Sequence, residues 1–165
     1  MSVNPFEPPA GRDPEEQDAA GWRISHQQAV LTDQFAIIHE RAHEQDEFAG
    51  LWWDNATDPV TIVLAVTSPT APLVADVMDS VPHPDRTRIE VAQRSVRDLE
   101  QLRAQIEPDA IRAGHGISID VSRNSIVLIL DQPNPGVEAD LVGRWGDAVA
   151  FDYGTFRYSP GNPPG

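Results

Sequence analysis

Five residues in the first third of the chain have the type and spacing of a zinc-peptidase motif. His39-Glu40-Arg41-Ala42-His43 matches H-E-x-x-H, and apolar residues recur at helical spacing before and within it. On a helix, two histidines four positions apart point the same way and can bind one metal ion. The glutamate between them can then act as general base on metal-bound water. One alternative is therefore a small zinc-dependent hydrolase that uses Glu40 as base and His39 and His43 as ligands.

The surroundings of this motif favour a solvated helix flank over a metal site. At about 100° per residue, the two histidines lie about 80–120° round the helix from the apolar stripe, at its edge. That stripe consists of Leu31, Phe35, Ile38 and Ala42. Charged residues surround the motif, and a third ligand could come only from Glu90 or His83 further along the chain. We therefore expect no catalytic residue, metal or cofactor, and keep zinc catalysis as the alternative.

The chain of 165 residues is strongly acidic and contains no cysteine. Its 12 Lys+Arg, all of them Arg, against 26 Asp+Glu give a formal net charge of −14. An anionic surface repels phosphate backbones and acidic lipid headgroups, so neither nucleic acid nor membrane is an expected partner. The lack of cysteine excludes disulfides, thiolate nucleophiles and cysteine-bound metal clusters. The N-terminus lacks a signal-peptide pattern, which predicts a cytoplasmic protein, or a secreted one if a leader has been removed.

Periodicity and turn residues predict an ordered set of helices and strands. The run Ser25-His26-Gln27-Gln28 matches a capping box and opens an amphipathic helix. We predict strands at 48–53, 61–67, 88–92, 116–120, 126–128 and 148–153, and further helices at 71–81, 95–107 and 135–145. The chain then divides into a disordered acidic and proline-rich arm (1–20), an N-terminal helix (21–47), a first unit with its linking helix (48–110), a second unit (111–156) and a flexible Pro/Gly tail (157–165).

The second half of this pattern repeats the order of the first. Residues 116–120 echo residues 50–54, and 126–128 echo 62–64 after a turn that is two residues shorter. A helix and a closing strand follow in both halves, so each unit has the order strand, hairpin turn, strand, helix, strand. A three-stranded unit with one helix is marginal alone, which gives a physical reason for two copies. The expected fold class is α+β, with two tandem β-β-α-β units behind an amphipathic helix.

Two adjacent tryptophans mark the first predicted strand. In a strand Trp52 and Trp53 point to opposite faces, and Trp53 shares its face with Leu51, which predicts a core position for Trp53. Trp52 then lies on the other face, either covered by the N-terminal helix or exposed as a partner contact. We favour the helix as its cover.

Two such units joined by a helix resemble the pro-regions of secreted bacterial serine proteases of the α-lytic protease and streptogrisin type. Within 88–106, a strand leads into RSVRDLEQL, which resembles that family's R-x-S-x-x-x-L-E-x-L. The hairpin 119–127, IDVSRNSIV, resembles its V-D-x-x-x-N-x-V-V. The chain is also similar to small stand-alone actinobacterial proteins with the same two units. The resemblance covers about residues 48–153, and its motifs specify fold better than activity.

The resemblance implies a non-enzymatic protein-interaction module that assists the folding of a serine peptidase or inhibits it. No Gly-Asp-Ser-Gly nucleophile segment is present, so that peptidase would be a separate molecule. In that family the pro-region adds its strands to a protease hairpin, which needs a free sheet edge, and lays its C-terminal tail in the substrate cleft. The edge here would be 88–92 or 148–153, and the expected partner-binding residues are Arg88, Glu90, Ala92, Phe151, Tyr153, Phe156 and Tyr158. A structural subunit that pairs with a copy of itself is a further alternative.

Overall fold

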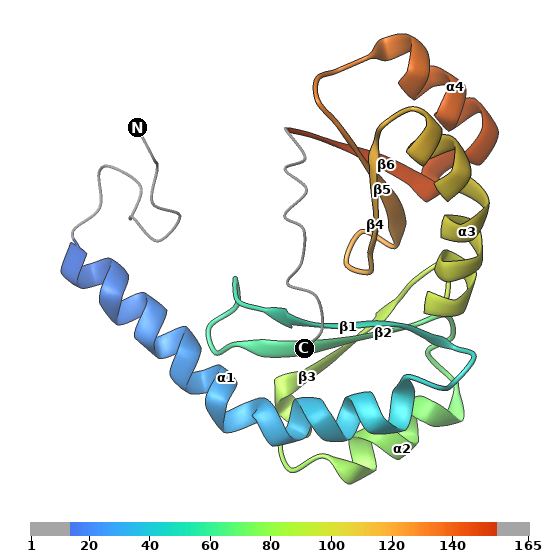
Figure 1. The fold of residues 1–165 in the computed structure, drawn as a ribbon. Helices are drawn as coiled ribbons and strands as arrows, with labels where there is room; N and C mark the ends of the chain where they lie inside the picture. Colours follow the sequence, from blue (N-terminus) through green and yellow to red (C-terminus); the bar gives the residue numbers. More distant parts are fainter. Residues whose placement is uncertain (1–13, 155–165) are drawn as a thin grey trace, which may run out of the picture.

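The computed structural model describes residues 14–154, whose helices and strands follow the predicted order (Figure 1). The helices are α1 (Pro14–Ala42), α2 (Pro72–Ser80), α3 (Val96–Arg112) and α4 (Pro135–Trp145), with the short 3-10 helices η1 (Pro84–Arg86) and η2 (Gly146–Ala148). The strands are β1 (Phe48–Asp54), β2 (Thr61–Val66), β3 (Thr87–Val91), β4 (Gly116–Asp120), β5 (Ser125–Leu130) and β6 (Val149–Tyr153).

Each half of the chain forms its own three-stranded mixed sheet. In the first sheet β2 is central, antiparallel to β1 and parallel to β3. In the second sheet β5 is central, antiparallel to β4 and parallel to β6. Matching hydrogen bonds close the two sheets: Ala92 N–H donates to the Val66 carbonyl and Gly154 N–H to the Leu130 carbonyl, both at 2.9 Å. The chain is therefore an α+β protein of two β-β-α-β units with the same topology, as the sequence predicts.

Two separate hydrophobic cores hold the sheets. The first lies between one face of the first sheet and helices α1 and α2, and the second lies between the second sheet and helices α3 and α4 (Figure 1). The central strands supply alternate buried residues to these cores: Ile62, Leu64 and Val66 from β2, and Ile126, Leu128 and Leu130 from β5. Val63 and Ala65 of β2 and Val127 of β5, on the opposite face, are buried as well. Such near-continuous apolar runs are typical of a central strand that is covered on both sides.

Helix α1 begins and ends earlier than the sequence predicts. It spans Pro14–Ala42 instead of 21–47, so its first turns belong to the segment expected to be disordered. Ser25, the expected N-cap, lies inside the helix. Pro14 is followed by two glutamates, and both features suit a helix start, because proline fits the first turn and acidic side chains favour the positive end of the helix dipole. Residues 43–47 form the turn that leads into β1.

Helix α3, the link between the units, begins with the cap that its sequence predicts. The Ser95 hydroxyl accepts a hydrogen bond from the Asp98 N–H at 3.1 Å, and the Asp98 carboxylate accepts one from the Ser95 N–H at 3.0 Å. These two bonds satisfy backbone donors that have no partner within the helix. The backbone and hydroxyl hydrogen bonds from Ser95 hold the pKa of Asp98 below its ordinary value.

The far end of α3 lies beyond its predicted limit at residue 107. Pro108 lies inside the helix, although proline removes one backbone hydrogen bond there. Ala110, one turn from Ile106, is buried in the second core, so tertiary packing outweighs the local cost of the proline. The helix ends at Arg112, and Gly114 just beyond it has a φ of +74°, a conformation that glycine adopts without strain.

The two tryptophans of β1 lie on opposite faces, as predicted, but Trp52 is not covered by α1. Trp53 packs on the first core and stacks on Phe35 of α1, with ring centroids 4.8 Å apart and an interplanar angle of 18°. Trp52 instead lines a groove against the β4–β5 turn of the second unit. The prediction for Trp52 was wrong because α1 lies on the face of the sheet that carries Leu51 and Trp53.

A buried glutamine ties the segment before β3 to α1. Gln34 is only 2% exposed, and its side-chain oxygen accepts a hydrogen bond from the His83 N–H at 2.8 Å. Its amide nitrogen donates to the His83 carbonyl at 2.8 Å and to the Thr87 hydroxyl at 2.9 Å. Each polar group of this side chain is therefore used, which makes its burial tolerable.

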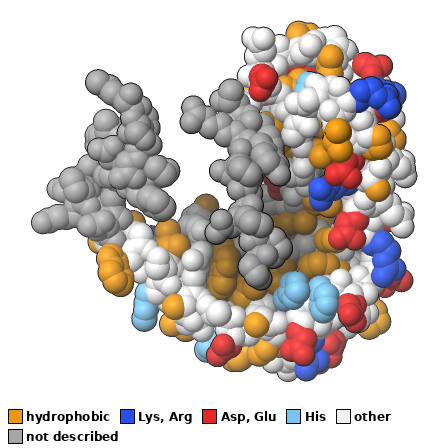
Figure 2. Space-filling model, viewed as in Figure 1, with side chains coloured by type: hydrophobic (Ala, Val, Ile, Leu, Met, Phe, Trp, Pro, Cys, Tyr) orange, Lys and Arg blue, Asp and Glu red, His pale blue; other side chains and the backbone are white. Residues whose placement is uncertain are grey.

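The second unit rises from one end of the first sheet, so that the two units border a hollow on the side of that sheet away from α1 and α2 (Figure 1). The space-filling view shows the same hollow, with hydrophobic side chains gathered at its base (Figure 2). The faces and strand edges that border this hollow are the surfaces that the predicted strand addition would use.

Candidate functional site

The predicted docking edges, β3 and β6, are edge strands in the structure. Each pairs with its central strand and has no second strand neighbour among residues 14–154. Along a strand paired in parallel, successive residues point their backbone groups alternately to the two sides. Because Ala92 and Gly154 donate to the central strands, the N–H groups of Val91 and Tyr153 point to the open edges. Val91 and Tyr153 are also well exposed, at 63% and 50%.

Two of the predicted partner-binding residues form an ion-pair network on the hollow side of the first sheet. Arg88 of β3 donates to Glu90 at 2.7 Å and reaches across the sheet to Asp54 of β1 at 2.9 Å. The hydrogen bond from Arg88 holds the pKa of Asp54 below its ordinary value. The bonds to Glu90 and Asp54 raise the pKa of the Arg88 guanidinium. The network joins the outer strands of the sheet across the buried side chain of Val63.

The second unit carries the same acid–cation–acid arrangement with a different cation. Asp120 ends β4 as Asp54 ends β1, and Asp152 occupies the position in β6 that Glu90 holds in β3. Here the cation is Arg123 from the β4–β5 turn, which is 2.8 Å from the carboxylate of Asp152 and 3.4 Å from that of Asp120.

The pKa of Asp120 reflects two opposing influences. Burial, the largest of them, raises this pKa, but hydrogen bonds from the Ser122 hydroxyl and from the N–H groups of Arg123 and Ser122 together hold it below its ordinary value. The pKa of Arg123 is raised, chiefly by its hydrogen bond to Asp152. In both units, therefore, the edge strand next to the hollow carries a charged side chain in an ion pair. Charged edges suppress indiscriminate strand pairing.

A hydrogen-bonded junction joins the two units behind these edges. Asn124, at the end of the β4–β5 turn, accepts from the Arg94 N–H at 2.9 Å and donates to the Arg94 carbonyl at 2.7 Å. Its φ of +52° is a conformation that asparagine tolerates better than most residues. The guanidinium of Arg94 donates to Asp147 in η2 at 2.5 Å. Hydrogen bonds thus join the segment just before α3 to both the β4–β5 turn and η2 of the second unit.

A groove of about 230 Å³ opens at this junction, and we refer to it as the junction groove. Its lining is mainly polar and comes from both units, including Trp52, Ala65, Glu90, Arg94, Arg123 and Asn124. Among these side chains the carboxylate and both guanidinium groups already have partners within the chain. The groove is therefore a polar cleft beside the edge of β3. Its lining does not combine a nucleophile with a general base, as a catalytic site would.

The H-E-x-x-H motif spans the end of α1 and the first residue of the turn after it, and its residues other than Ala42 are exposed. The rings of His39 and His43 stack, with centroids 4.8 Å apart and an interplanar angle of 4°. The Nδ1 atom of His43 is 2.8 Å from the His39 carbonyl oxygen, and Glu40 is exposed beside them. The described part of the chain contains no group of three or more His, Cys, Asp or Glu side chains that could hold a metal ion.

The structure does not bring either proposed third ligand to the histidine pair. The backbone of His83 is hydrogen-bonded to Gln34, more than one turn before the pair on α1. Glu90 is hydrogen-bonded to Arg88 on the hollow side of the sheet, away from α1. Among residues 14–154 the pair is therefore not joined by the third ligand that a catalytic zinc site uses.

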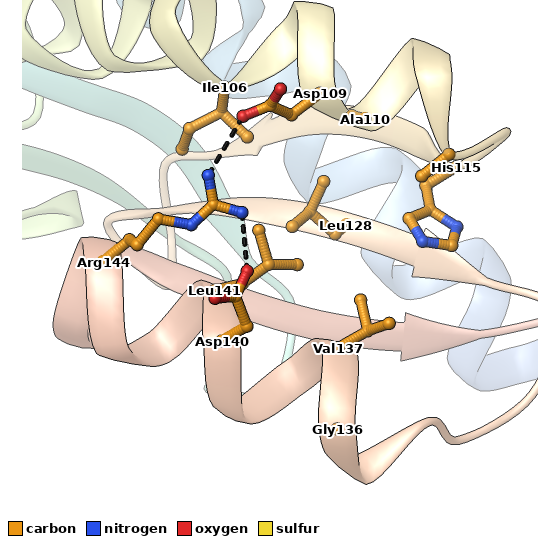
Figure 3. A pocket seen from close by; sticks show the side chains of 11 residues that line it. Ile106, Asp109, Ala110, His115, Leu128, Gly136, Val137, Asp140, Leu141 and Arg144 are labelled. Atoms are coloured by element: carbon orange, nitrogen blue, oxygen red, sulfur yellow. Dashed lines mark hydrogen bonds and ion pairs between the residues drawn. The ribbon is translucent and has the colours of Figure 1, made fainter.

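A second pocket, of about 230 Å³, lies between α3 and α4 over the second sheet (Figure 3). Apolar side chains form its walls, and Arg144 lies at its rim, where it donates to Asp140 at 2.6 Å and to Asp109 at 3.2 Å. The hydrogen bond to Asp140 is the chief cause of the raised pKa of Arg144. The volume is below the roughly 300–1,000 Å³ of usual small-molecule sites.

The remaining predicted partner-binding residues differ in their surroundings. Phe151 packs against the second core, so its ring is unavailable to a partner, while its backbone faces the open edge. Tyr153 is half exposed, and its hydroxyl donates to Glu138 of α4, which raises the pKa of Tyr153. The backbone N–H of Ala92 is used by β2. Phe156 and Tyr158 lie outside the described residues.

Sequence reasoning placed Arg94 and Asn124 in the two family-like motifs and Gly50 in the repeat, but it did not predict that these residues join the two units. The available signals were the asparagine within the turn SRNS and the glycine within an otherwise large-residue strand. Neither signal identifies its partner, because the two contacts join residues 30 and 71 positions apart in sequence.

Comparison of the chain with protein-family models and with curated protein sequences gave no match. Within the described residues, no helix is both long and apolar enough to cross a membrane.

Proposed function

We propose that this chain is a non-enzymatic protein-binding module that assists the folding of a separate serine peptidase or inhibits it, by adding a strand to the peptidase at β3 or β6. The observation that carries the proposal is that, among residues 14–154, both predicted docking strands lie at sheet edges with backbone N–H groups directed away from the central strands. Strand addition derives its affinity from such unpaired main-chain groups.

The character of each edge supports selective rather than general pairing. Both strands are short, and a paired charge lies on each: Glu90 with Arg88 on β3, and Asp152 with Arg123 on β6. Edges of this kind resist aggregation yet leave room for a partner strand that complements the charges. A partner strand carrying basic side chains next to the carboxylates would be favoured by the net charge of −14.

The contacts at the junction also support the proposal. Two hydrogen bonds between the Asn124 side chain and the Arg94 backbone tie the β4–β5 turn to the segment that follows β3. A preorganised concave surface loses less conformational entropy on binding than one that must first be ordered.

A purified α-lytic-type or streptogrisin-type peptidase tests the proposal directly. We expect the chain to slow hydrolysis of a chromogenic peptide in a saturable way, or to raise the rate at which the denatured mature peptidase regains activity. A set of such peptidases that shows neither effect at high micromolar concentrations of the chain would rule out this function.

Proline variants identify the edge that is used. Val91→Pro and Tyr153→Pro each remove one N–H at an open edge without removing a bond to the central strand. Val91→Ala and Tyr153→Ala keep that N–H and serve as matched controls. We expect one proline variant to weaken binding to the peptidase at least tenfold while its alanine control binds nearly as well as the native chain. Equal binding by both proline variants and the native chain would exclude strand addition at these two edges.

A further inference from the structure

A pocket of about 280 Å³ lies between α1 and the 3-10 helix η1, and we call it the α1–η1 pocket. Its volume is close to the lower limit of about 300 Å³ that is usual for small-molecule sites. One wall comes from α1 and the other from η1 and the residue before it; the lining consists of His26, Gln27, Val30, Leu31, His83, Asp85 and Arg86. The pocket lies beside α1, on the side of the first sheet away from the hollow, so it is separate from the proposed strand addition (Figure 1).

Hydrogen bonds beside the pocket hold its two walls together. The Val60 N–H donates to the side-chain oxygen of Gln27 at 2.7 Å, and the Val60 carbonyl accepts from Nε of Arg86 at 3.2 Å. Both backbone groups of His83 are bonded to the buried side chain of Gln34 on α1. The Arg86 N–H in turn donates to the His83 carbonyl at 3.0 Å. The pocket is therefore preformed, and a ligand would not have to order its walls.

Arg86 differs from the other described arginines in having no acidic partner. Every other arginine between residues 14 and 154 forms an ion pair with an aspartate or glutamate of the chain. Among the described side chains Arg86 is paired with none, although the sequence has 26 acidic residues for its 12 basic ones. Its Nε atom is bonded to Val60, which leaves the donors of both Nη atoms without a described partner. A partly buried guanidinium in this state favours an anion.

The chemistry around Arg86 suits a carboxylate. With Nε occupied, the two Nη atoms can donate two parallel hydrogen bonds to the oxygens of one carboxylate. His26 and His83 add exposed imidazoles to the lining, and each imidazole has at least one N–H donor. Asp85 is the acidic residue of the lining; it is exposed and forms no ion pair with Arg86. A carboxylate carries a single negative charge, so a chain of net charge −14 repels it less than it repels a phosphate.

The apolar part of the lining indicates what the carboxylate is attached to. Val30 is 59% exposed although it lines the pocket, and Leu31 next to it belongs to the first core. An apolar group placed on Val30 would remove this surface from water. Because the net charge of the chain repels free anions, the burial of apolar surface has to supply part of the affinity.

We propose that the α1–η1 pocket binds a carboxylate carried on a compact apolar group, with the Nη atoms of Arg86 donating to the carboxylate and the apolar group covering Val30. Small organic acids share this chemistry with the C-terminus of a peptide that ends in an apolar residue. The site does not depend on strand addition, because none of its residues belongs to β3 or β6.

NMR titration of the isotope-labelled full chain with phenylacetate and phenylacetamide tests the ligand class, because these probes differ in charge but hardly in shape. We expect saturable shifts at residues 26–31 and 83–86 with phenylacetate, with a dissociation constant in about the millimolar range. Phenylacetamide should bind at least tenfold more weakly. A short N-acetylated peptide that ends in leucine, with a free or an amidated C-terminus, is the second pair of probes.

Selective binding of either acid over its amide supports the site, and the acid that binds more tightly identifies the source of the carboxylate. If neither acid shifts these residues, or if each acid binds no better than its amide, the proposal is wrong.

Substitutions of Arg86 and Asp85 have opposite expected effects. Arg86→Gln removes the guanidinium and should weaken binding of the acid at least tenfold. Asp85→Asn removes a like charge and should strengthen binding about twofold or more. Arg112→Gln is the matched control and should bind like the native chain, since the Arg112 side chain is 80% exposed on α3. Native-like binding by Arg86→Gln, or weaker binding by Asp85→Asn, would overturn the proposal.

Val30→Asp separates the loss of binding from a loss of structure. Arg86→Gln also removes the hydrogen bond to Val60, whereas Val30→Asp leaves that bond intact and changes an exposed residue. The new carboxylate lies in the lining, so we expect it to repel the ligand and to weaken binding at least tenfold. Circular dichroism verifies that each variant is folded. A folded Val30→Asp variant that binds phenylacetate like the native chain would contradict the assigned pocket.

Discussion

Val121 in the β4–β5 turn lies directly against Gly50 in β1. A Cβ atom at position 50 would be 2.6 Å from the Cβ of Val121, closer than real Cβ atoms approach other heavy atoms. Gly50 also has a φ of +154° and lies where the β1–β2 register shifts, a conformation that side chains rarely adopt. The contact joins residues 71 positions apart in sequence (121 − 50) and brings the second unit's turn onto the first unit's sheet. Glycine at position 50 is therefore a condition for the way the two units meet.

Gly50→Ala is expected to destabilise the protein by about 1–3 kcal/mol, because the added methyl group forces the units apart and strains the backbone. Urea unfolding measures the change. Val121→Gly removes the Cβ that the new methyl group would meet, so the double variant should recover part of the loss. A double-mutant cycle with no coupling would mean that the cost arises from the backbone of residue 50 alone.

Asn124→Gly separates the side-chain bonds of Asn124 from its backbone conformation. Glycine keeps the positive φ but loses both hydrogen bonds to Arg94, so we expect a loss of about 1–3 kcal/mol in the free energy of unfolding. The Arg94 N–H and carbonyl would be left without these partners at the junction. Ser122→Ala, in the same turn but without a bond to the first unit, is the control and should cost less. Equal costs for the two variants would show that the inter-unit bonds contribute nothing measurable.

Gln34→Leu is expected to cost about 1–3 kcal/mol, although leucine is the more apolar residue. The substitution leaves the His83 N–H, the His83 carbonyl and the Thr87 hydroxyl without the partner that the structure gives them. Gln34→Glu keeps the acceptor for the His83 N–H and places a negative charge in a buried position. Thermal unfolding of both variants would measure the two effects. A Gln34→Leu variant as stable as the native chain would contradict the stabilising role of the hydrogen bonds that this side chain makes.

The cap of α3 makes part of the stability depend on pH. The hydrogen bonds from Ser95 hold the pKa of Asp98 below its ordinary value of 3.8 in the folded state. A lowered folded pKa stabilises the protein above the unfolded pKa, and this contribution is lost as the pH falls through the folded value. Ser95→Ala should cost about 0.5–2 kcal/mol at neutral pH. For Asp98→Asn, we expect the difference from the native chain to shrink between about pH 5 and about pH 2.5. A constant difference over that range would contradict the assignment.

The positions of the helices and strands were predictable from the sequence, because local residue patterns differ between the two kinds of element. A run rich in β-branched residues identified β2, the repeat of the same element order identified β5 and α4, and Ser95 with Asp98 suited the start of α3. These signals are carried by residues close together in the chain, where a single pattern is sufficient. The α+β class and the order of the elements follow from them.

The contacts over long sequence distances were not predictable in the same way. Whether Trp52 or Trp53 lies under α1 depends on which face of the first sheet the helix covers, and neighbouring strand residues do not reveal that choice. The continuation of α3 through Pro108 depends on the burial of Ala110 against strands that follow it in sequence. The H-E-x-x-H motif shows the converse: a strong local pattern does not supply the third ligand, which tertiary structure would have to provide.

Helix α3 contributes unequally to the two cores. Val96, its first residue, packs against the first core, while Leu99, Ile106 and Ala110 belong to the second. Each sheet is built from a contiguous stretch of chain, so neither half depends on the other for a strand. The unfolding of the two halves is then coupled through α3 and a few contacts around the β4–β5 turn. Native-state amide exchange would accordingly divide this protein into two foldons, with α3 protected together with the second.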